Sequence, residues 1–185
     1  MNLLSVTGKK WILKNCNSQE VDFIKDNFFL DTMTSKLIAI KKIKKEDINN
    51  YLNPTIKNIL PNPNVLKDME KTTKRTIQSI INSENIGIFG DYDVDGASST
   101  ALLGKFFSEI KHPFHIYIPD RKLEGYGPNK KGFDYLINQK SKIIFTVDCG
   151  TLSFETIDYA FKKKIDVLVL DHHQSEIKLP NAFSV

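Results

Sequence analysis

Four short apolar runs alternate with segments of helical periodicity in the second part of the sequence. The runs occupy residues 86–89 (IGIF), 114–118 (FHIYI), 143–147 (IIFTV) and 166–170 (DVLVL), and the helical segments occupy 97–110, 131–140 and 153–164. Apolar runs of this length are typical of strands buried on both faces of a sheet. Strands that alternate with helices predict an α/β fold, in which helices flank a parallel β-sheet through right-handed crossovers.

The first part of the sequence lacks this alternation. Residues 1–64 mix short apolar patches with lysines and end in LNPTIKNILPNPNV, in which Asn-Pro pairs mark turns. We interpret them as an irregular or helical N-terminal arm with a linker, and residues 65–185 as the domain that holds the sheet. Between Val65 and Asn82, helical spacing returns and predicts one apolar helix face, made of Leu66, Met69, Ile77, Ile80 and Ile81.

Composition excludes several classes of protein. A hydrophobic content of 41% and a charged content of 26% are typical of a soluble globular protein. No apolar run has the length of a membrane span, and the first residues lack the apolar core of a signal peptide. Cys16 and Cys149 lie far apart and suggest no disulfide framework, so we expect a reducing, cytoplasmic location. The net charge of +4 favours anionic partners only weakly.

Acidic and histidine side chains directly follow three of the predicted strands. They are Asp91, Asp93 and Asp95 in GDYDVDG (90–96), Asp148 in VDCG, and Asp171, His172 and His173 in DHH. In open α/β sheets, ligands bind at the carboxyl edge of the strands, so these side chains are expected to converge there. Clustered carboxylates repel one another and would take up protons unless a cation neutralised them. The pattern therefore predicts a metal site.

Other readings of the first motif fit less well. An EF-hand loop that began at Asp91 would need a glutamate at its twelfth position, where Leu102 stands. An aspartyl phosphatase of the haloacid dehalogenase type would need a threonine after its Asp-x-Asp-Gly, and it would need no DHH. Helix capping explains one aspartate of the motif, but three are present. Oxygen ligands with one or two imidazoles favour Mn²⁺ or Mg²⁺ over a structural zinc. Cys149 in VDCG has no partner cysteine for a zinc site, so we expect it to pack as a small residue.

GDYDVDG, VDCG and DHH, in this order and at this spacing, resemble the first three motifs of the DHH phosphoesterase superfamily. The stretches KKWILK, NPNVLKDMEK, FGDYDVDGASSTALL, IPDRKLEGYGPN and LPNAFSV further resemble the RecJ family of bacterial exonucleases. This resemblance implies a monomeric enzyme of DNA repair and recombination that degrades single-stranded DNA from its 5′ end. It also implies two divalent ions, manganese or magnesium, that clamp the phosphodiester and activate a water molecule.

The resemblance assigns a role to each residue of the three motifs. Asp93 and Asp95 resemble metal ligands of the first motif, and Asp148 resembles a carboxylate that bridges both ions. His172 resembles a ligand of the second ion, and His173 resembles the histidine that contacts the scissile phosphate. Asp171 is expected to orient the two histidines from behind.

One position departs from the superfamily pattern. Many members place a ligating histidine four residues before the aspartate that Asp93 matches, and Phe89 stands there in this chain. Asp91 is therefore expected either to complete the first metal site or to hydrogen-bond within its own loop.

The segment PDRKLEGYGPNKKG (119–132) is a candidate substrate-binding region. Arg121 and Lys122 are placed to hold a DNA backbone, and Tyr126 is placed to stack on a base. A long loop between a strand and a helix needs glycine and proline in any case, so both interpretations stay open.

The resemblance also implies that further segments normally follow the third motif. We therefore expect an N-terminal fragment with an incomplete DHH domain that has little exonuclease activity by itself. Two alternatives remain at this stage. One is a related phosphoesterase that acts on short oligonucleotides, cyclic dinucleotides or pyrophosphate, and the other is a non-catalytic module that binds metal or nucleic acid.

Overall fold

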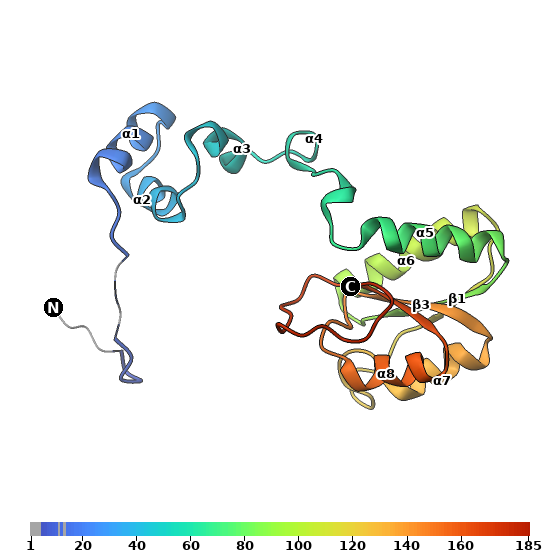
Figure 1. Ribbon diagram of the computed structural model, residues 1–185. Coiled ribbons are helices and arrows are strands. Elements are labelled where there is room, and N and C mark those ends of the chain that lie inside the picture. The colour runs from blue at the N-terminus through green and yellow to red at the C-terminus, as the bar shows by residue number, and fades with distance from the viewer. Residues whose placement is uncertain (1–4, 11, 13) are drawn as a thin grey trace. The chain divides into compact units, whose positions relative to one another are not determined.

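The computed structural model describes residues 5–10, 12 and 14–185 (Figure 1). Trp11 and Leu13 of the KKWILK stretch lie outside the described residues. Contacts within the chain divide it into two compact units, Met1–Asn62 and Pro63–Val185.

The first unit is helical. It contains α1 (Ser18–Phe28), α2 (Thr32–Lys41), a 3₁₀ turn η1 (Lys45–Asp47), α3 (Ile48–Leu52) and α4 (Ile56–Ile59). The side chains of Asn17 and Asp31 accept hydrogen bonds from the first backbone N–H groups of α1 and α2, which fixes where both helices begin. Its small apolar core comprises Val21, Ile24, Ile38, Ala39 and Ile48. The expected N-terminal arm has both characters, since the described residues before Ser18 carry no helix and the helices lie between Ser18 and Ile59.

The second unit is built on a four-stranded sheet in the order β2-β1-β3-β4. The strands are β1 (Asn85–Gly90), β2 (Phe114–Tyr117), β3 (Ser141–Val147) and β4 (Asp166–Leu170), and every pairing is parallel. In the central register Ile88 lies opposite both Ile116 and Phe145. The predicted α/β fold with a parallel sheet is therefore confirmed, and each predicted strand is present.

Helices cover both faces of this sheet (Figure 1). They are α5 (Met69–Ile81), α6 (Val94–Glu109), α7 (Lys130–Asn138) and α8 (Phe154–Lys162), and a 3₁₀ turn, η2 (Pro63–Val65), precedes α5. Side chains of α5 and α6 pack on one face, over Ile86, Ile88, Ile143, Phe145 and Leu168. Side chains of α7 and α8 pack on the other, over Phe89, Ile144, Val167 and Val169. Burial on both faces explains why the strands appear in the sequence as continuous apolar runs.

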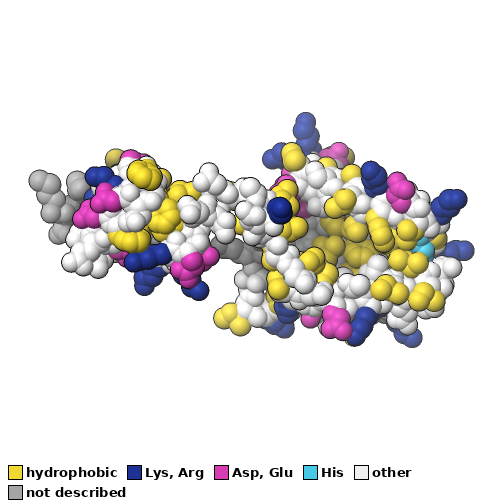
Figure 2. All heavy atoms as spheres, turned by 90° about the horizontal axis from the view of Figure 1, so that it is seen from above, with side chains coloured by type: hydrophobic (Ala, Val, Ile, Leu, Met, Phe, Trp, Pro, Cys, Tyr) yellow, Lys and Arg dark blue, Asp and Glu magenta, His cyan; other side chains and the backbone are white. Residues whose placement is uncertain are grey.

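Helix α5 differs from its prediction in its start and its buried side. It begins at Met69, after Asp68 in a left-handed conformation (φ 54°). Ile80 packs against the core as predicted, but Ile77 and Ile81 are exposed, and Thr72 and Ser79 are buried instead. Ion pairs on the polar side of α5 explain how the helix is oriented on the sheet. The Arg75 guanidinium bonds to Asp166 (2.6 Å) and Glu84 (2.8 Å). Figure 2 shows apolar side chains gathered on the larger unit. Ile77 and Ile81 of α5 and Leu102 and Phe106 of α6 are among the exposed apolar residues.

The strand order determines where a ligand can bind. The chain leaves β1 towards α6 on one face of the sheet and leaves β3 towards α8 on the other face. Since β1 and β3 are neighbours, a crevice opens between their carboxyl ends, as at the switch point of other doubly wound sheets.

Two further observations complete the fold. The Phe183 N–H donates to the Val167 carbonyl (2.9 Å), and the Val169 N–H donates to the Ser184 carbonyl (3.0 Å), so residues 183–184 line the outer edge of β4. None of the described helices is long and apolar enough to cross a membrane.

Candidate metal centre

The loop that follows β1 turns sharply because two glycines allow close packing. A Cβ atom on Gly96 would lie 2.5 Å from the Asp91 carbonyl oxygen, and one on Gly90 would lie 1.9 Å from the Thr100 hydroxyl. Neither position accepts a larger residue without rearrangement. The tight turn places Asp91 and Asp93 at the carboxyl edge of the sheet.

The two aspartates of this loop differ in environment. Asp93 is exposed and caps α6, since its Oδ1 accepts a hydrogen bond from the Gly96 N–H at 2.9 Å, and this bond lowers its pKa. Capping is therefore one role of the motif. Asp91 is only 1% exposed, and burial raises its pKa, with a further contribution from the nearby Asp93 charge. A buried carboxylate without a cap to form needs another explanation.

Asp148 brings β3 into the same cluster. Its backbone is left-handed (φ 60°), and its N–H donates to the Leu170 carbonyl at 2.8 Å, which joins the ends of β3 and β4. Ligand atoms of Asp91, Asp93 and Asp148 all lie within 4.8 Å of one another. Those of Asp148, His172 and His173 form a second such group. Asp148 thus belongs to both groups.

The electrostatics of the cluster suit a cation. Burial raises the pKa of Asp148, and the adjacent Asp93 raises it further. Asp91 Oδ1 and Asp148 Oδ2 are buried, and neither finds a hydrogen-bond partner in the described part of the chain. Two buried, unpartnered carboxylate oxygens at a cluster of negative charge are costly unless a positive ion satisfies them. With imidazoles beside them, these donors fit Mn²⁺ or Mg²⁺.

The DHH segment holds its two histidines in different ways. His172 is 73% exposed, and its Nε2 lies 3.1 Å from Asp148 Oδ1. His173 is held by Asp171, whose Oδ1 accepts from the His173 N–H (3.1 Å) and from Nδ1 (2.7 Å). Burial of Asp171 opposes its ionisation, but hydrogen bonds donated by Thr151 and His173 outweigh it and lower the pKa to about 2. The same contact with Asp171 raises the pKa of His173.

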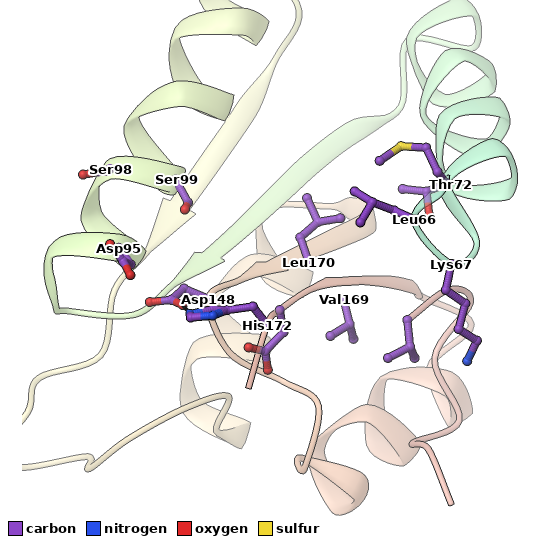
Figure 3. Close-up of a pocket in the computed structure, with 13 residues that line it drawn as sticks. Leu66, Lys67, Thr72, Asp95, Ser98, Ser99, Asp148, Val169, Leu170 and His172 are labelled. Atoms are coloured by element: carbon purple, nitrogen blue, oxygen red, sulfur yellow. Dashed lines mark ion pairs between the residues drawn. The ribbon is translucent and has the colours of Figure 1, made fainter. Parts of the chain in front are cut away.

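A cavity of about 710 Å³ opens beside these residues (Figure 3). One end is polar and carries Asp95, Ser98 and Ser99 of α6 together with Asp148 and His172, whereas Leu66, Val169 and Leu170 line the other end. Among the described residues, Asp95 is in neither of the two close ligand groups. It lies in the first turn of α6 and faces the same cavity as Asp148.

The segment 119–132 meets the cluster through some of its residues only. The Tyr126 hydroxyl donates to the Asp148 carbonyl (3.3 Å) and lies 3.3 Å from His173 Nδ1. Local desolvation of this hydroxyl raises its pKa, although 56% of the residue is exposed. The Arg121 guanidinium lies 5.4 Å from the ring centroid of Tyr92, between Asp91 and Asp93 in the first motif. The Lys122 side chain is exposed, and only its backbone N–H is anchored, to Asp120.

Glu124 holds this segment in shape. Its carboxylate accepts hydrogen bonds from the Tyr117 hydroxyl (2.7 Å), the Asn129 amide (3.2 Å) and the Lys131 ammonium (3.1 Å). The Tyr117 bond, with help from Lys131, lowers the Glu124 pKa to about 2. These bonds tie the loop that carries Tyr126 to β2 and to the start of α7.

Sequence reasoning missed one residue of this region and judged another correctly. Thr151 binds Asp171 through both its hydroxyl and its backbone N–H, and the only signal was its position directly after VDCG. Cys149 was expected to pack as a small residue. It is fully buried, its Sγ lies 3.4 Å from the Val147 carbonyl, and burial raises its pKa, so it is no thiolate ligand.

Comparison with known proteins adds three findings. Residues 85–185 match the model of the DHH family, N-terminal domain. The single-stranded-DNA-specific exonuclease RecJ of Bacillus subtilis is 34% identical over 123 residues, which cover 66% of this chain and 16% of the relative. RecJ of Haemophilus influenzae is 34% identical over 141 residues, which cover 72% of this chain and 23% of the relative. The chain therefore spans less than a quarter of these relatives.

Solved structures give a concordant result. A crystal structure of exonuclease RecJ bound to manganese matches with a TM-score of 0.59 and 27% identity, over 64% of this chain and 30% of that one. RecJ from Thermus thermophilus in complex with Mn²⁺ matches with a TM-score of 0.61, over 92% of this chain and 24% of that one. At 20% identity, this second match supports a shared fold and nothing further.

Proposed function

Since the chain belongs to the DHH family, we propose that it forms the metal-binding part of a hydrolase that cleaves phosphodiester bonds in single-stranded DNA. The single observation that carries this proposal is the position of Asp148. Its carboxylate belongs to both clusters of possible metal ligands, the one with Asp91 and Asp93 and the one with His172 and His173. Such sharing is what a bridging ligand of two ions requires. The relatives named as single-stranded-DNA-specific exonucleases support the choice of substrate.

In this proposal the clustered carboxylates and one histidine bind the two metal ions. Asp91, Asp93 and Asp148 would hold one manganese or magnesium ion, and Asp148 with His172 would hold the other, with Asp95 available on the same cavity wall. When bound, such ions neutralise phosphate charge and lower the pKa of a water molecule. We propose manganese in preference to magnesium, because the similar RecJ structures contain manganese.

Groups of the chain itself would bind and orient the substrate. His173, fixed through Nδ1, would direct Nε2 at the scissile phosphate and would donate a hydrogen bond to it when the ring is protonated. The positive end of the α6 dipole lies at the same edge and favours a phosphate there. Tyr126 and Arg121 adjoin the cluster and are suited to a base and a backbone phosphate, and the exposed Lys122 adds positive charge farther out. We place this activity in the cytoplasm, in a monomer that acts on DNA from its 5′ end during repair and recombination.

The test is manganese-dependent cleavage by the full-length gene product. Single-stranded DNA labelled at the 5′ end should release labelled mononucleotides first, whereas duplex DNA should persist. Asp148→Ala should abolish the reaction, and Glu109→Ala, at the opposite end of α6, should not. Parallel assays with pyrophosphate and cyclic dinucleotides separate the proposed nuclease from other phosphoesterases. A preference for either small substrate over DNA would overturn the proposal.

A further inference from the structure

Thr151 makes two hydrogen bonds to one oxygen of Asp171. Its hydroxyl donates to Asp171 Oδ2 at 2.6 Å, and its backbone N–H donates to the same atom at 3.0 Å. Thr151 is itself buried. The contact joins the loop after β3 to the loop after β4, twenty residues later in the sequence.

The second oxygen of Asp171 is reserved for His173. Asp171 Oδ1 accepts from the backbone N–H of His173 and from its ring Nδ1, and only 2% of the Asp171 side chain is exposed. The carboxylate is thus divided, with two donors from Thr151 on one oxygen and two from His173 on the other. Loss of the Thr151 hydroxyl would remove the shortest bond to Oδ2, leave the backbone N–H as its remaining donor among the described residues, and loosen the hold on the carboxylate plane.

This arrangement decides which nitrogen of His173 carries the proton. A carboxylate only accepts hydrogen bonds, so the 2.7 Å contact places the proton of a neutral ring on Nδ1. Nε2 is then the nitrogen left for a substrate group. The Tyr126 ring lies edge-to-face with the imidazole, at 5.9 Å between centroids, and limits its movement on that side.

A purely structural role explains the Thr151 hydroxyl less well. The Ser153 N–H donates to the Gly150 carbonyl at 3.0 Å, so the turn after β3 is already closed by its own backbone. Thr151, Asp171, His173 and Tyr126 moreover line a cavity of about 460 Å³, which opens on the histidine. The buried hydroxyl therefore lies directly behind a cavity that the histidine also lines.

We propose that Thr151 is a positioning residue, which fixes the orientation and the tautomer of His173 by anchoring Asp171. Its effect on turnover rests on the proposed function, whereas its effect on the imidazole does not. Residues that hold a site histidine from behind commonly change activity by about 10- to 100-fold when they are replaced.

The experiment compares Thr151→Val, which keeps the shape and removes the hydroxyl, with Thr151→Ser, which keeps the hydroxyl. Thr76→Val is the matched control, because that hydroxyl bonds only to the Thr72 carbonyl within α5. In the full-length gene product, Thr151→Val should lower kcat about 10- to 100-fold with KM unchanged to within about twofold. Thr151→Ser and Thr76→Val should stay near the wild type.

Nitrogen-15 NMR of the metal-free chain supplies a readout that is independent of catalysis. In the wild type and in Thr151→Ser, the His173 ring should show a protonated Nδ1 and an unprotonated Nε2 at alkaline pH. In Thr151→Val the two nitrogens should move towards averaged shifts. If the wild type has no nuclease activity but these shifts change, the positioning role stands and the proposed function falls. Wild-type shifts and kcat in a folded Thr151→Val variant would overturn the positioning role. If that variant does not fold, Thr151→Ala takes its place under the same criteria.

Discussion

Replacing Asp148 by asparagine should stabilise the metal-free chain and abolish most of its stabilisation by manganese. Asp148 is buried beside Asp91 and Asp93, with ligand atoms within 4.8 Å, and its Oδ2 finds no hydrogen-bond partner in the described residues. Asparagine has nearly the same shape, carries no charge, and offers an amide that can donate to a neighbouring carboxylate. The substitution therefore removes repulsion without creating a cavity.

The expected magnitude follows from the charges. Two unit charges at 4.8 Å, the largest separation within this group, repel by about 3–4 kcal/mol at an effective dielectric constant of about 20, before screening by solvent on the open side is counted. The lost contact with His172 offsets little, because that imidazole is largely exposed and such pairs contribute about 0–1 kcal/mol. Solvent on the open side and partial proton uptake reduce the repulsion further. We expect a net gain of about 1–2 kcal/mol in the free energy of unfolding.

The pH dependence has a definite sign. Because the pKa of Asp148 is raised above 3.8 in the folded state, the folded chain binds more protons than the unfolded chain between the two values. The destabilisation is complete above the raised folded pKa and fades as the pH falls to about 3.8. The advantage of Asp148→Asn should therefore be largest at neutral pH and smallest in acid.

Urea unfolding followed by circular dichroism measures both effects, with Glu109→Gln as the control. In EDTA, Asp148→Asn should unfold at a higher urea concentration than the wild type. With free manganese at about 100 times its Kd, the wild type should gain about 2.7 kcal/mol, and the variant should gain much less. A variant that is less stable than the wild type in EDTA, or that gains equally from manganese, would refute this account of the cluster.

Three further predictions concern single side chains. His172→Ala should weaken manganese binding in calorimetry by roughly tenfold or more, whereas His173→Ala should chiefly lower kcat. Equal manganese affinity in the wild type and in His172→Ala would contradict the assignment of His172 as the metal ligand. Arg75→Met should lower the free energy of unfolding by about 1–3 kcal/mol, because it leaves the partly buried Glu84 without its cation. A decrease of less than about 0.5 kcal/mol would show that the Arg75–Glu84 ion pair does not stabilise the fold. Glu124→Gln should destabilise the chain by about 1 kcal/mol at pH 7 and progressively less below about pH 4.5. The reason is that a carboxylate whose pKa is lowered by folding stabilises the folded state fully only above the pKa that it has in the unfolded chain. A difference in urea unfolding that does not change with pH would show that the lowered Glu124 pKa is not the cause.

The sheet and the carboxyl edge could be predicted because they depend on simple periodicity. A short apolar run of four or five residues is typical of a buried strand, and alternation with helices predicts that the strands are parallel. Parallel strands bring their carboxyl ends to one edge, so the approach of Asp148 to the first motif followed without knowledge of the strand order. The order itself was not predictable, since it depends on the faces along which α6, α7 and α8 cross the sheet.

The orientation of α5 shows a limit of the same reasoning. Helical spacing shows which side chains share a face, but not which face is buried. In α5 the apolar residues Ile77 and Ile81 are exposed, while Thr72 and Ser79 are buried. The Thr72 hydroxyl bonds to Ser184, and Arg75 bonds to a residue of β4 and to the residue before β1, contacts that no local pattern encodes. The buried side of α5 is therefore shared by Ile80 of the apolar stripe and by polar residues whose partners are distant in sequence.

The candidate site combines both kinds of information. Its carboxylates could be read from the sequence because their number and spacing are abnormal for a structural loop. The hydroxyl of Thr151 could not, because a threonine after a glycine is unremarkable until β4 returns Asp171 to within 2.6 Å of it. The role of Asp91, open between ligand and loop contact, now favours the ligand, because its Oδ1 is buried without a partner among the described residues. A cluster that is unfavourable by itself and completed by a cation links the stability of this fold to its proposed chemistry.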